Sequence, residues 1–193
     1  DVIHHELNTK NIFVDSELNP KITEFGFMIK PQNSSRISSH STVNNNIKNG
    51  KEIPYYLSPE IIQYNENEID GEDENNIEGE KASDVYSFAF VVYEIITNRI
   101  PFSNVKDQNQ LFKEVINKMS RPSLDGVPPK YKELISVCWS GDPKERPTFD
   151  KIVGILGTDK EFINEEINSD EYHNYIKTIE QSNSRTIISN FRI

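Results

Sequence analysis

The chain has 193 residues, of which 35% are hydrophobic and one is a cysteine, and its formal net charge at pH 7 is −10. One cysteine excludes a disulfide framework, the acidic balance argues against nucleic acid as a partner, and no apolar run approaches the length that crosses a bilayer. We therefore expect an intracellular, cytoplasmic protein without a membrane segment in this chain.

Near the N-terminus, three side chains carry oxygen atoms suited to a hard cation. Glu6 and Asn11 lie in IHHELNTKN, Glu24 lies in ITEFGF, and the intervals are five and thirteen residues. Magnesium accepts carboxylate and carboxamide oxygens, and two loops lying side by side would bring these groups together. The spacing therefore predicts a magnesium and phosphate site. Between the loops, two short β-prone runs flank a turn at residues 19–20, which predicts a hairpin.

Two polar stretches follow the hairpin. Residues 28–52 are rich in serine and asparagine and predict a long flexible segment. Residues 63–80 contain eight carboxylates and no lysine or arginine, so we expect a solvated surface insertion. Its simplest interpretation is a spacer. The alternatives are a docking strip for a basic partner and a low-affinity binder of divalent ions, although the spacing does not match an EF-hand loop.

Helical spacing of apolar residues dominates the second half of the chain. A helix that begins at an N-cap, Ser83, and ends at Asn98 is apolar on nearly all faces, which predicts that it is buried. Cys138 is interpreted as a buried structural thiol rather than a nucleophile. Beyond residue 157 the acidic tail allows one or two helices, and packing and partial disorder both remain open. Three amphipathic helices are predicted, at 111–119, 134–139 and 149–156.

Five segments resemble motifs of protein kinases and occur in the family's order. They are HHELNTKN, TEFGF, YYLSPE, SDVYSFAFVVYEIITNRIPF and CWSGDPKERPTF. The resemblance covers residues 1–157 and is greatest for the tyrosine-kinase-like group. It implies an α+β protein-kinase-like fold, of which this chain would form the mainly α-helical C-terminal lobe with a short β-hairpin. That lobe would include an activation segment at 24–60 and the acidic insertion at 63–80, and the acidic C-terminal tail would follow at 158–193.

The N-terminal lobe of the family is expected to be missing. No Gly-rich phosphate loop, strand lysine or partner-helix glutamate precedes the catalytic loop in this sequence. In the family, the helix that packs beneath the catalytic loop would also lie upstream. We therefore expect the long apolar helix near residue 90 to be partly uncovered.

The resemblance assigns catalytic and metal-binding roles to four residues. Glu6 matches the catalytic aspartate, and Asn8 stands where kinases of this group carry a lysine against the transferring phosphoryl group. Asn11 and Glu24 match the asparagine and the aspartate that bind magnesium and, through it, the nucleotide. Of these positions, Asn11 is an unaltered match.

Four further residues are expected to hold the fold rather than to catalyse. Glu60 and Arg146 match a buried ion pair of the family. Asp84 matches an aspartate that braces the backbone of the catalytic loop, and His4 matches the motif histidine of the same brace.

Several polar groups of the family's site are altered. The extra methylene of a glutamate moves its carboxylate by about 1 Å, and a misplacement on that order costs roughly 100-fold in rate. At Asn8 a neutral amide replaces an ammonium group, and losing one such electrostatic stabiliser costs roughly 3 to 4 kcal/mol. Ile53 lacks the hydroxyl of the threonine that Ser/Thr kinases usually place there. His5 replaces an arginine that clamps phosphorylated activation segments.

These departures favour a catalytically impaired pseudokinase that acts as a regulatory and interaction module with weak ATP binding. The alternative is an active Ser/Thr protein kinase that transfers phosphate from ATP to a protein hydroxyl, with Glu6 and Glu24 in the aspartate roles. ATP and Mg²⁺ are the cofactors if the domain is active, which would need the N-terminal lobe, and otherwise none is expected. The expected partner is a protein substrate or a regulated protein, with a basic protein as a further partner of the acidic insertion.

Overall fold

The computed structural model describes residues 3–16, 19–23, 55–67, 77–162, 168, 170–175 and 177–178. The chain divides into two compact units, residues 1–148 and 149–193. Most of the predicted activation segment, with Glu24 and Ile53, lies outside the described residues, as does the centre of the predicted acidic insertion.

A short antiparallel hairpin follows the N-terminal loop of the first unit, as the sequence predicts. Strands β1 (Ile12–Val14) and β2 (Pro20–Ile22) pair in the register Ile12↔Ile22, Phe13↔Lys21 and Val14↔Pro20. Asp15 closes the turn, because its carboxylate accepts a hydrogen bond from the Asn19 backbone amide at 2.8 Å. The hairpin thus carries the polar loop at residues 3–11 on its N-terminal side.

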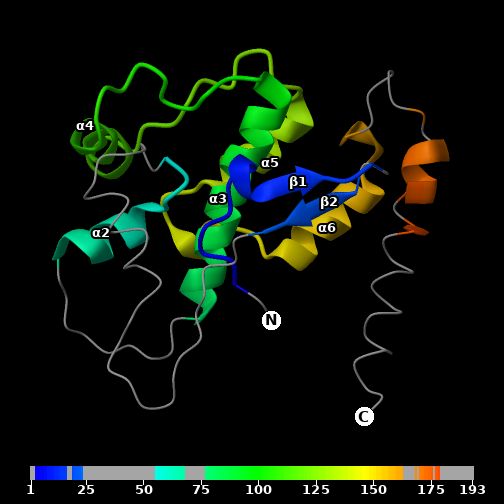
Figure 1. The fold of residues 1–193 in the computed structure, drawn as a ribbon, viewed down its shortest axis with the longest axis horizontal. Helices are drawn as coiled ribbons and strands as arrows, with labels where there is room; N and C mark the ends of the chain where they lie inside the picture. The colour runs from blue at the N-terminus through cyan, green and yellow to red at the C-terminus, as the bar shows by residue number, and fades with distance from the viewer. Residues whose placement is uncertain are drawn as a thin grey trace, which may run out of the picture. The chain divides into compact units, whose positions relative to one another are not determined.

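Helices make up most of the rest of the first unit in its described parts. The longest, α3, runs through the middle of this unit (Figure 1). In the residues that the structure describes, mainly helical elements with one short hairpin agree with the expected architecture. In chain order the elements are the 3-10 turn η1 (Thr9–Asn11), α2 (Pro59–Asn67), α3 (Ile77–Thr97), α4 (Gln108–Phe112), the π-helical turn η2 (Lys113–Asn117), α5 (Pro129–Cys138) and the 3-10 turn η3 (Pro143–Glu145).

The start of α3 differs from its prediction. The sequence predicts an N-cap at Ser83, which is wrong because the helix begins at Ile77 and holds Ser83 in its interior. The intervening residues 78–82 are mostly good helix formers and extend the helix. The buried Ser83 hydroxyl lies 2.9 Å from that of Ser58. The end of α3 is as predicted, because Asn98 follows the last helical residue and adopts the left-handed φ of 51°.

The core of the first unit forms where α3 packs against α5. Tyr86, Ala89 and Phe90 of α3 are fully buried, as are Ile135 and Cys138 of α5. Burial raises the pKa of the Cys138 thiol to about 12, so the thiol is protonated at neutral pH. The sequence-based interpretation of a structural thiol therefore agrees with its environment.

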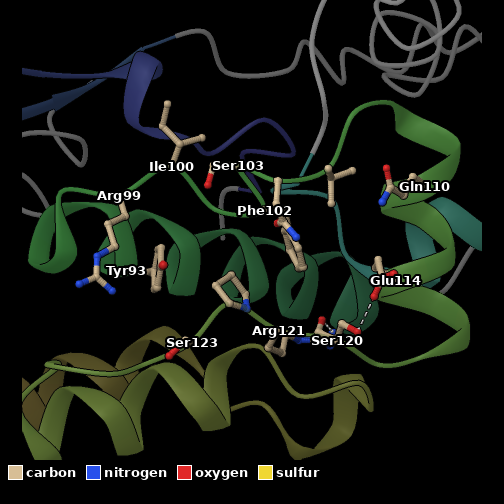
Figure 2. A pocket seen from close by; sticks show the side chains of 13 residues that line it. Tyr93, Arg99, Ile100, Phe102, Ser103, Gln110, Glu114, Ser120, Arg121 and Ser123 are labelled. Carbon is tan, nitrogen blue, oxygen red and sulfur yellow. Dashed lines mark hydrogen bonds between the residues drawn. The ribbon is translucent and has the colours of Figure 1, made fainter.

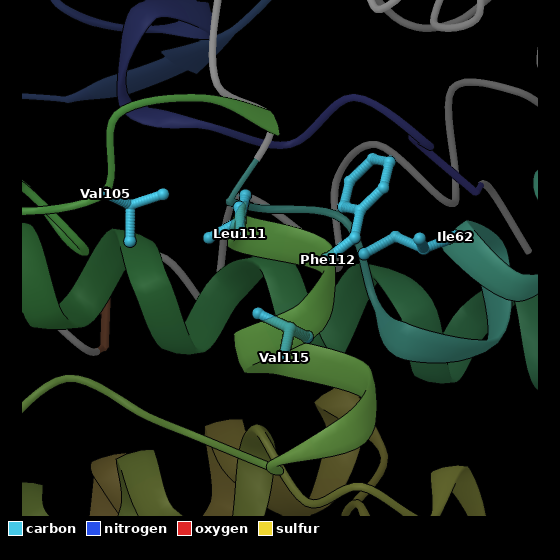
Figure 3. Close-up of a cluster of buried hydrophobic side chains, with 5 residues drawn as sticks. All are labelled: Ile62, Val105, Leu111, Phe112 and Val115. Carbon is cyan, nitrogen blue, oxygen red and sulfur yellow. The ribbon is translucent and has the colours of Figure 1, made fainter. Parts of the chain in front are cut away.

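A second apolar cluster joins α2 to α4 and η2 (Figure 3). Phe102 and Tyr55 pack against its edge. This cluster fixes the chain around residue 55 to the helical part of the unit. Its buried members are Ile62, Val105, Leu111, Phe112 and Val115.

Near residue 90, where an uncovered surface is expected, Phe90, Val91 and Tyr93 of α3 are buried, and a strongly exposed apolar side chain lies nearer the end of the helix. Ile95 is 70% exposed, although it lies in a helix whose preceding turns are buried. Within the parts of the chain that the structure describes, no helix combines the length and the apolar character needed to cross a membrane.

The second unit contains α6 (Phe149–Thr158), the 3-10 turn η4 (Lys160–Phe162) and a helical stretch at residues 170–175. Asn168 caps this stretch, because its side-chain oxygen accepts hydrogen bonds from the amides of Asp170 at 3.0 Å and Glu171 at 3.3 Å. The hydroxyl of Tyr172 donates to the carbonyl of Leu156. This hydrogen bond connects a helical part of the acidic tail with α6.

Candidate functional site

The loop at residues 3–11 is held to α3 by one buried carboxylate. Asp84 accepts the backbone amide of His4 through Oδ2 at 2.6 Å and that of His5 through Oδ1 at 2.8 Å. Asp84 is only 5% exposed, so these charge-assisted bonds are sheltered from water. His5 adopts a φ of 67°, a left-handed conformation that a non-glycine residue keeps only when its surroundings enforce it. The carboxylate therefore sets the path of the loop backbone.

The ring of His4 connects the loop to the end of the hairpin. Its Nδ1 accepts the backbone amide of Glu6 at 3.2 Å, which leaves Nε2 to donate to the carbonyl of Thr23 at 2.9 Å. This pattern assigns the neutral tautomer with the proton on Nε2. Because Thr23 directly precedes Glu24, the same bond fixes the chain where the second predicted loop begins.

Asn8 and Asn11 both turn into the loop. Each side-chain amide donates to the backbone carbonyl of Glu6, at 2.8 Å from Asn8 and at 2.8 Å from Asn11. Asn8 is also the N-cap of η1, because its side-chain oxygen accepts the amides of Lys10 at 2.9 Å and Asn11 at 3.2 Å. The carboxamide of Asn8 thus stabilises the turn.

The structure brings three of the four predicted catalytic and metal-binding residues into one loop, namely Glu6, Asn8 and Asn11. Glu24 lies outside the described residues, so its position relative to Asn11 stays a prediction. Among the described residues, no group of three or more His, Cys, Asp or Glu side chains is arranged to hold a metal ion. The side-chain oxygen of Asn11 is the atom of this loop suited to magnesium, with Glu24 as its predicted companion.

Glu60 and Arg146 form a bidentate ion pair. Arg146 Nη1 lies 2.7 Å from Glu60 Oε1, and Nη2 lies 2.8 Å from Oε2. The arginine also donates to the carbonyls of Ala82 at 2.9 Å and Ser140 at 3.0 Å. Its side chain is 0% exposed, whereas that of Glu60 is 28% exposed. One guanidinium therefore joins α2, α3 and the segment before η3.

Sequence reasoning missed a second carboxylate on α3. Glu94 Oε2 accepts hydrogen bonds from Thr9 Oγ1 and the Tyr56 hydroxyl, both at 2.6 Å, and Oε1 accepts from the Tyr55 hydroxyl at 2.7 Å. Burial and the hydrogen bond to Glu94 raise the pKa of Tyr55, and the same two causes raise that of Tyr56 to about 12. A glutamate within the apolar run VVYEII was the available signal, because such a charge needs partners.

The sequence also contains no signal for a tyrosine whose ring contacts two arginines. The guanidinium carbons of Arg121 and Arg146 lie 5.3 Å and 5.0 Å from the centre of the Tyr86 ring. Arg121 is fixed there by donating to the carbonyls of Trp139 at 2.9 Å and Ser120 at 2.8 Å. Among the described residues, the buried Tyr86 hydroxyl has no hydrogen-bond partner, and burial raises its pKa to about 12.

A pocket of about 400 Å³ opens between residues 99–105, the α4–η2 helix and residues 120–123 (Figure 2). Its wall includes Glu114, whose carboxylate accepts the Ser120 hydroxyl at 2.9 Å. None of the pocket's lining residues belongs to the loop at residues 3–11. The pocket is therefore no part of the candidate catalytic site.

Comparison with known proteins identifies the family. The pattern of the protein tyrosine and serine/threonine kinase family matches residues 1–156. The chain belongs to the protein kinase family, which confirms the resemblance found in its motifs. The loop at residues 3–11 lies within the matched region, and its assignment as the catalytic loop of the domain stays a prediction from its motif.

Curated relatives from Dictyostelium discoideum support this membership. The dual specificity protein kinase shkD is 31% identical over 156 residues, which are 79% of this chain and 18% of that protein. The probable serine/threonine-protein kinase roco7 is 33% identical over 169 residues, which are 81% of this chain and 6% of that protein. The dual specificity protein kinase pyk3 is 31% identical over an alignment of 196 residues, which covers 95% of this chain and 13% of that protein. The chain thus spans less than a fifth of the length of each of these relatives.

Proposed function

We propose that this chain is part of a protein kinase domain in which phosphoryl transfer is impaired and which acts as a regulatory and interaction module. The observation that carries the proposal is the placement of Asn8. A neutral amide stands where a cation would face the phosphoryl group, and both of its polar atoms bond to the loop backbone. A group engaged in this way does not stabilise charge that develops on a transferring phosphoryl group.

The retained framework supports a binding role. Asp84 and His4 fix the loop backbone, and Arg146 bonds Glu60, although the groups nearest to the chemistry differ from those of the family. Such a loop can present the side-chain oxygen of Asn11 and, as predicted, the carboxylate of Glu24 to a magnesium ion. We therefore propose weak, magnesium-dependent ATP binding in the whole domain. The proposed partner is a regulated protein.

An active Ser/Thr protein kinase is the second candidate. The intact bracing of the loop by Asp84 favours it, and the curated relatives are themselves described as kinases. In this alternative, Glu6 would orient the substrate hydroxyl, and Glu24 would bind the magnesium ion with its longer side chain.

The deciding experiment measures phosphoryl transfer and magnesium-dependent nucleotide binding by the full-length protein. We compare the wild type with Glu6→Ala, with the double variant Glu6→Asp and Glu24→Asp, and with that double variant carrying Asn8→Lys. Glu133→Asp, on an exposed position of α5, is the matched control. We expect little transfer by the wild type and a gain in the restored variants. Transfer by the wild type that Glu6→Ala abolishes would establish the active enzyme instead.

A further inference from the structure

Three segments that are far apart in the sequence meet at the carboxylate of Glu94. Thr9 comes from η1 in the catalytic loop, Tyr55 and Tyr56 come from the segment just before α2, and Glu94 lies in the last turns of α3. All three hydroxyl contacts with the carboxylate are 2.6 or 2.7 Å long. We call these four residues the Glu94 junction.

The proton count of the junction makes the carboxylate its centre. Thr9 Oγ1, the Tyr56 oxygen and Glu94 Oε2 form a triangle with sides of 2.6, 2.6 and 3.0 Å. Two hydroxyl groups supply two protons, so two of the three sides can be hydrogen bonds at one time. The two short sides both end on the ionised oxygen, which is the stronger acceptor. The Tyr56 oxygen can then accept the backbone amide of Thr9, which lies at 3.4 Å.

The surroundings of the junction strengthen these bonds. The Tyr55 and Tyr56 rings lie 4.6 Å apart, and each lies 6.2 Å from the ring of the buried Phe90. Aromatic groups on this side exclude water and lower the local dielectric constant, which makes a charge-assisted hydrogen bond worth more than at an open surface. Both tyrosines are half-buried and are therefore immobilised together with α3.

The junction is connected to Asn11, the predicted magnesium ligand, through the turn η1. Thr9 begins η1, and the Ile12 amide bonds back to the Thr9 carbonyl. Asn11 lies in the same turn and donates both to the Asn8 carbonyl at 3.1 Å and to the Glu6 carbonyl at 2.8 Å. Holding the Thr9 hydroxyl therefore holds the turn that carries Asn11.

We propose that Thr9 is a positioning residue that fixes the catalytic loop to α3 and to Tyr56 through the Glu94 junction. The isoleucine at position 53 has no hydroxyl with which to bond the loop, whereas the hydroxyl of Tyr56, three residues further along the same segment, lies 3.0 Å from Thr9 Oγ1. This inference concerns the position of the loop, and it rests on the proposed nucleotide binding only for its second measurement.

The test uses the full-length protein and a matched set of single substitutions. Thr9→Val keeps the shape of the side chain and removes the hydroxyl, whereas Thr9→Ser keeps the hydroxyl. Thr97→Val is the control, because the Thr97 hydroxyl donates to the Tyr93 carbonyl on the same helix at 2.7 Å and does not touch the loop. Tyr55→Phe removes a bond to Glu94 that does not involve the loop. Hydrogen–deuterium exchange of peptides spanning residues 3–14 reports the opening of the loop.

We expect Thr9→Val to speed exchange of these loop peptides by about 10- to 100-fold, since a hydrogen bond to a charged group is lost. Thr9→Ser, Thr97→Val and Tyr55→Phe should remain within about threefold of the wild type. Magnesium-dependent ATP affinity should fall by about 10-fold in Thr9→Val alone. Urea midpoints close to that of the wild type would show that the change is local.

The two measurements separate the junction from the proposed function. Wild-type exchange in Thr9→Val, or equal acceleration in Thr9→Ser or Thr97→Val, would overturn the role of Thr9 whether or not the protein binds ATP. Failure of the wild type to bind ATP would contradict the proposed nucleotide binding, and the exchange measurement would still decide the role of Thr9.

Discussion

Asn8 illustrates how one residue can change both the chemistry and the folding of a loop. Its side-chain oxygen accepts two backbone amides of η1, and its amide group donates to the carbonyl of Glu6. A lysine at this position has a donor and no acceptor, so it cannot cap the turn. Restoring the family's cation would therefore remove a structural contact at the same time.

Asn8→Lys is accordingly expected to lower the free energy of unfolding by about 1 kcal/mol, the usual cost of losing an N-cap. Asn8→Asp keeps the acceptor oxygen and is the matched variant, with a smaller expected loss. Urea unfolding of the full-length protein measures both. A lysine variant as stable as the wild type would contradict the capping role, and it would also make the rescue of phosphoryl transfer easier to interpret.

At the residue scale, motifs identified contacts better than composition did. The sequence pointed to His4, Asp84, Glu60 and Arg146, and the structure gives each of them partners of matching chemistry. The Glu94 junction was not predicted because the apolar spacing of the helix does not indicate which groups bond a carboxylate within it. Contacts between positions 9 and 94 depend on tertiary packing, which one sequence does not contain.

At the element scale, Arg146 couples two helices to the segment before η3. It bonds the carboxylate of Glu60 in α2, the carbonyl of Ala82 in α3 and that of Ser140 before η3. Its planar fork matches a carboxylate in a way that the ammonium group of a lysine does not. Removing the arginine would leave the Glu60 charge without its partner, although the 28% exposure of Glu60 allows water to compensate in part.

We expect Arg146→Met to lower the free energy of unfolding by about 3 kcal/mol, at the low end of the cost of breaking a buried pair because Glu60 is partly exposed. Arg146→Lys should cost less, since it keeps the charge. Lys144→Met, at an exposed neighbouring position, is the control and should lie within about 0.5 kcal/mol of the wild type. Urea unfolding ranks the three variants, and equal losses for methionine and lysine at position 146 would contradict the importance of charge.

The helices also show the limits of local signals. Asn98 ends α3 as predicted because a left-handed residue terminates a helix through its own backbone geometry. Ser83 failed as a start signal because residues 78–82 continue the helix and the hydroxyl finds Ser58 instead. A capping residue predicts a helix start only where the residues before it are poor helix formers.

For the whole molecule, the hairpin, α3 and the helices that follow it were predictable because each element has a distinct apolar period. Helix α2 was not predicted, and it extends into the expected acidic insertion at 63–80. The packing of aromatic and charged groups around α3 was not predictable. The Tyr86 ring contacts Arg121 and Arg146, and Tyr55 and Tyr56 bond to Glu94, so these tyrosines contribute to the stability of the unit in a way that depends on pH.

The sign of this dependence follows from the raised pKa values. Below pH 10 each tyrosine is protonated in both the folded and the unfolded chain, so its full contribution to the free energy of unfolding is present. Above pH 10 the unfolded tyrosines ionise while Tyr86, with its pKa raised to about 12 by burial, stays protonated in the folded chain. Stability is therefore lost as pH rises from about 10 to about 12, at about 1.4 kcal/mol per pH unit for Tyr86. Tyr55 and Tyr56 also lower the stability as pH rises, but their effects are smaller because both side chains are partly exposed to solvent.

The substitution Tyr86→Phe isolates the effect of the buried Tyr86 hydroxyl on stability at alkaline pH. At pH 7 the variant should be as stable as the wild type or up to about 1 kcal/mol more stable, because the hydroxyl has no partner among the described residues and phenylalanine still offers its ring to both arginines. Between pH 10 and pH 11 it should lose about 1 kcal/mol less than the wild type, measured by urea unfolding at each pH. An identical alkaline loss in both proteins would place the Tyr86 hydroxyl in contact with water, since only a solvated phenol ionises at its ordinary pKa.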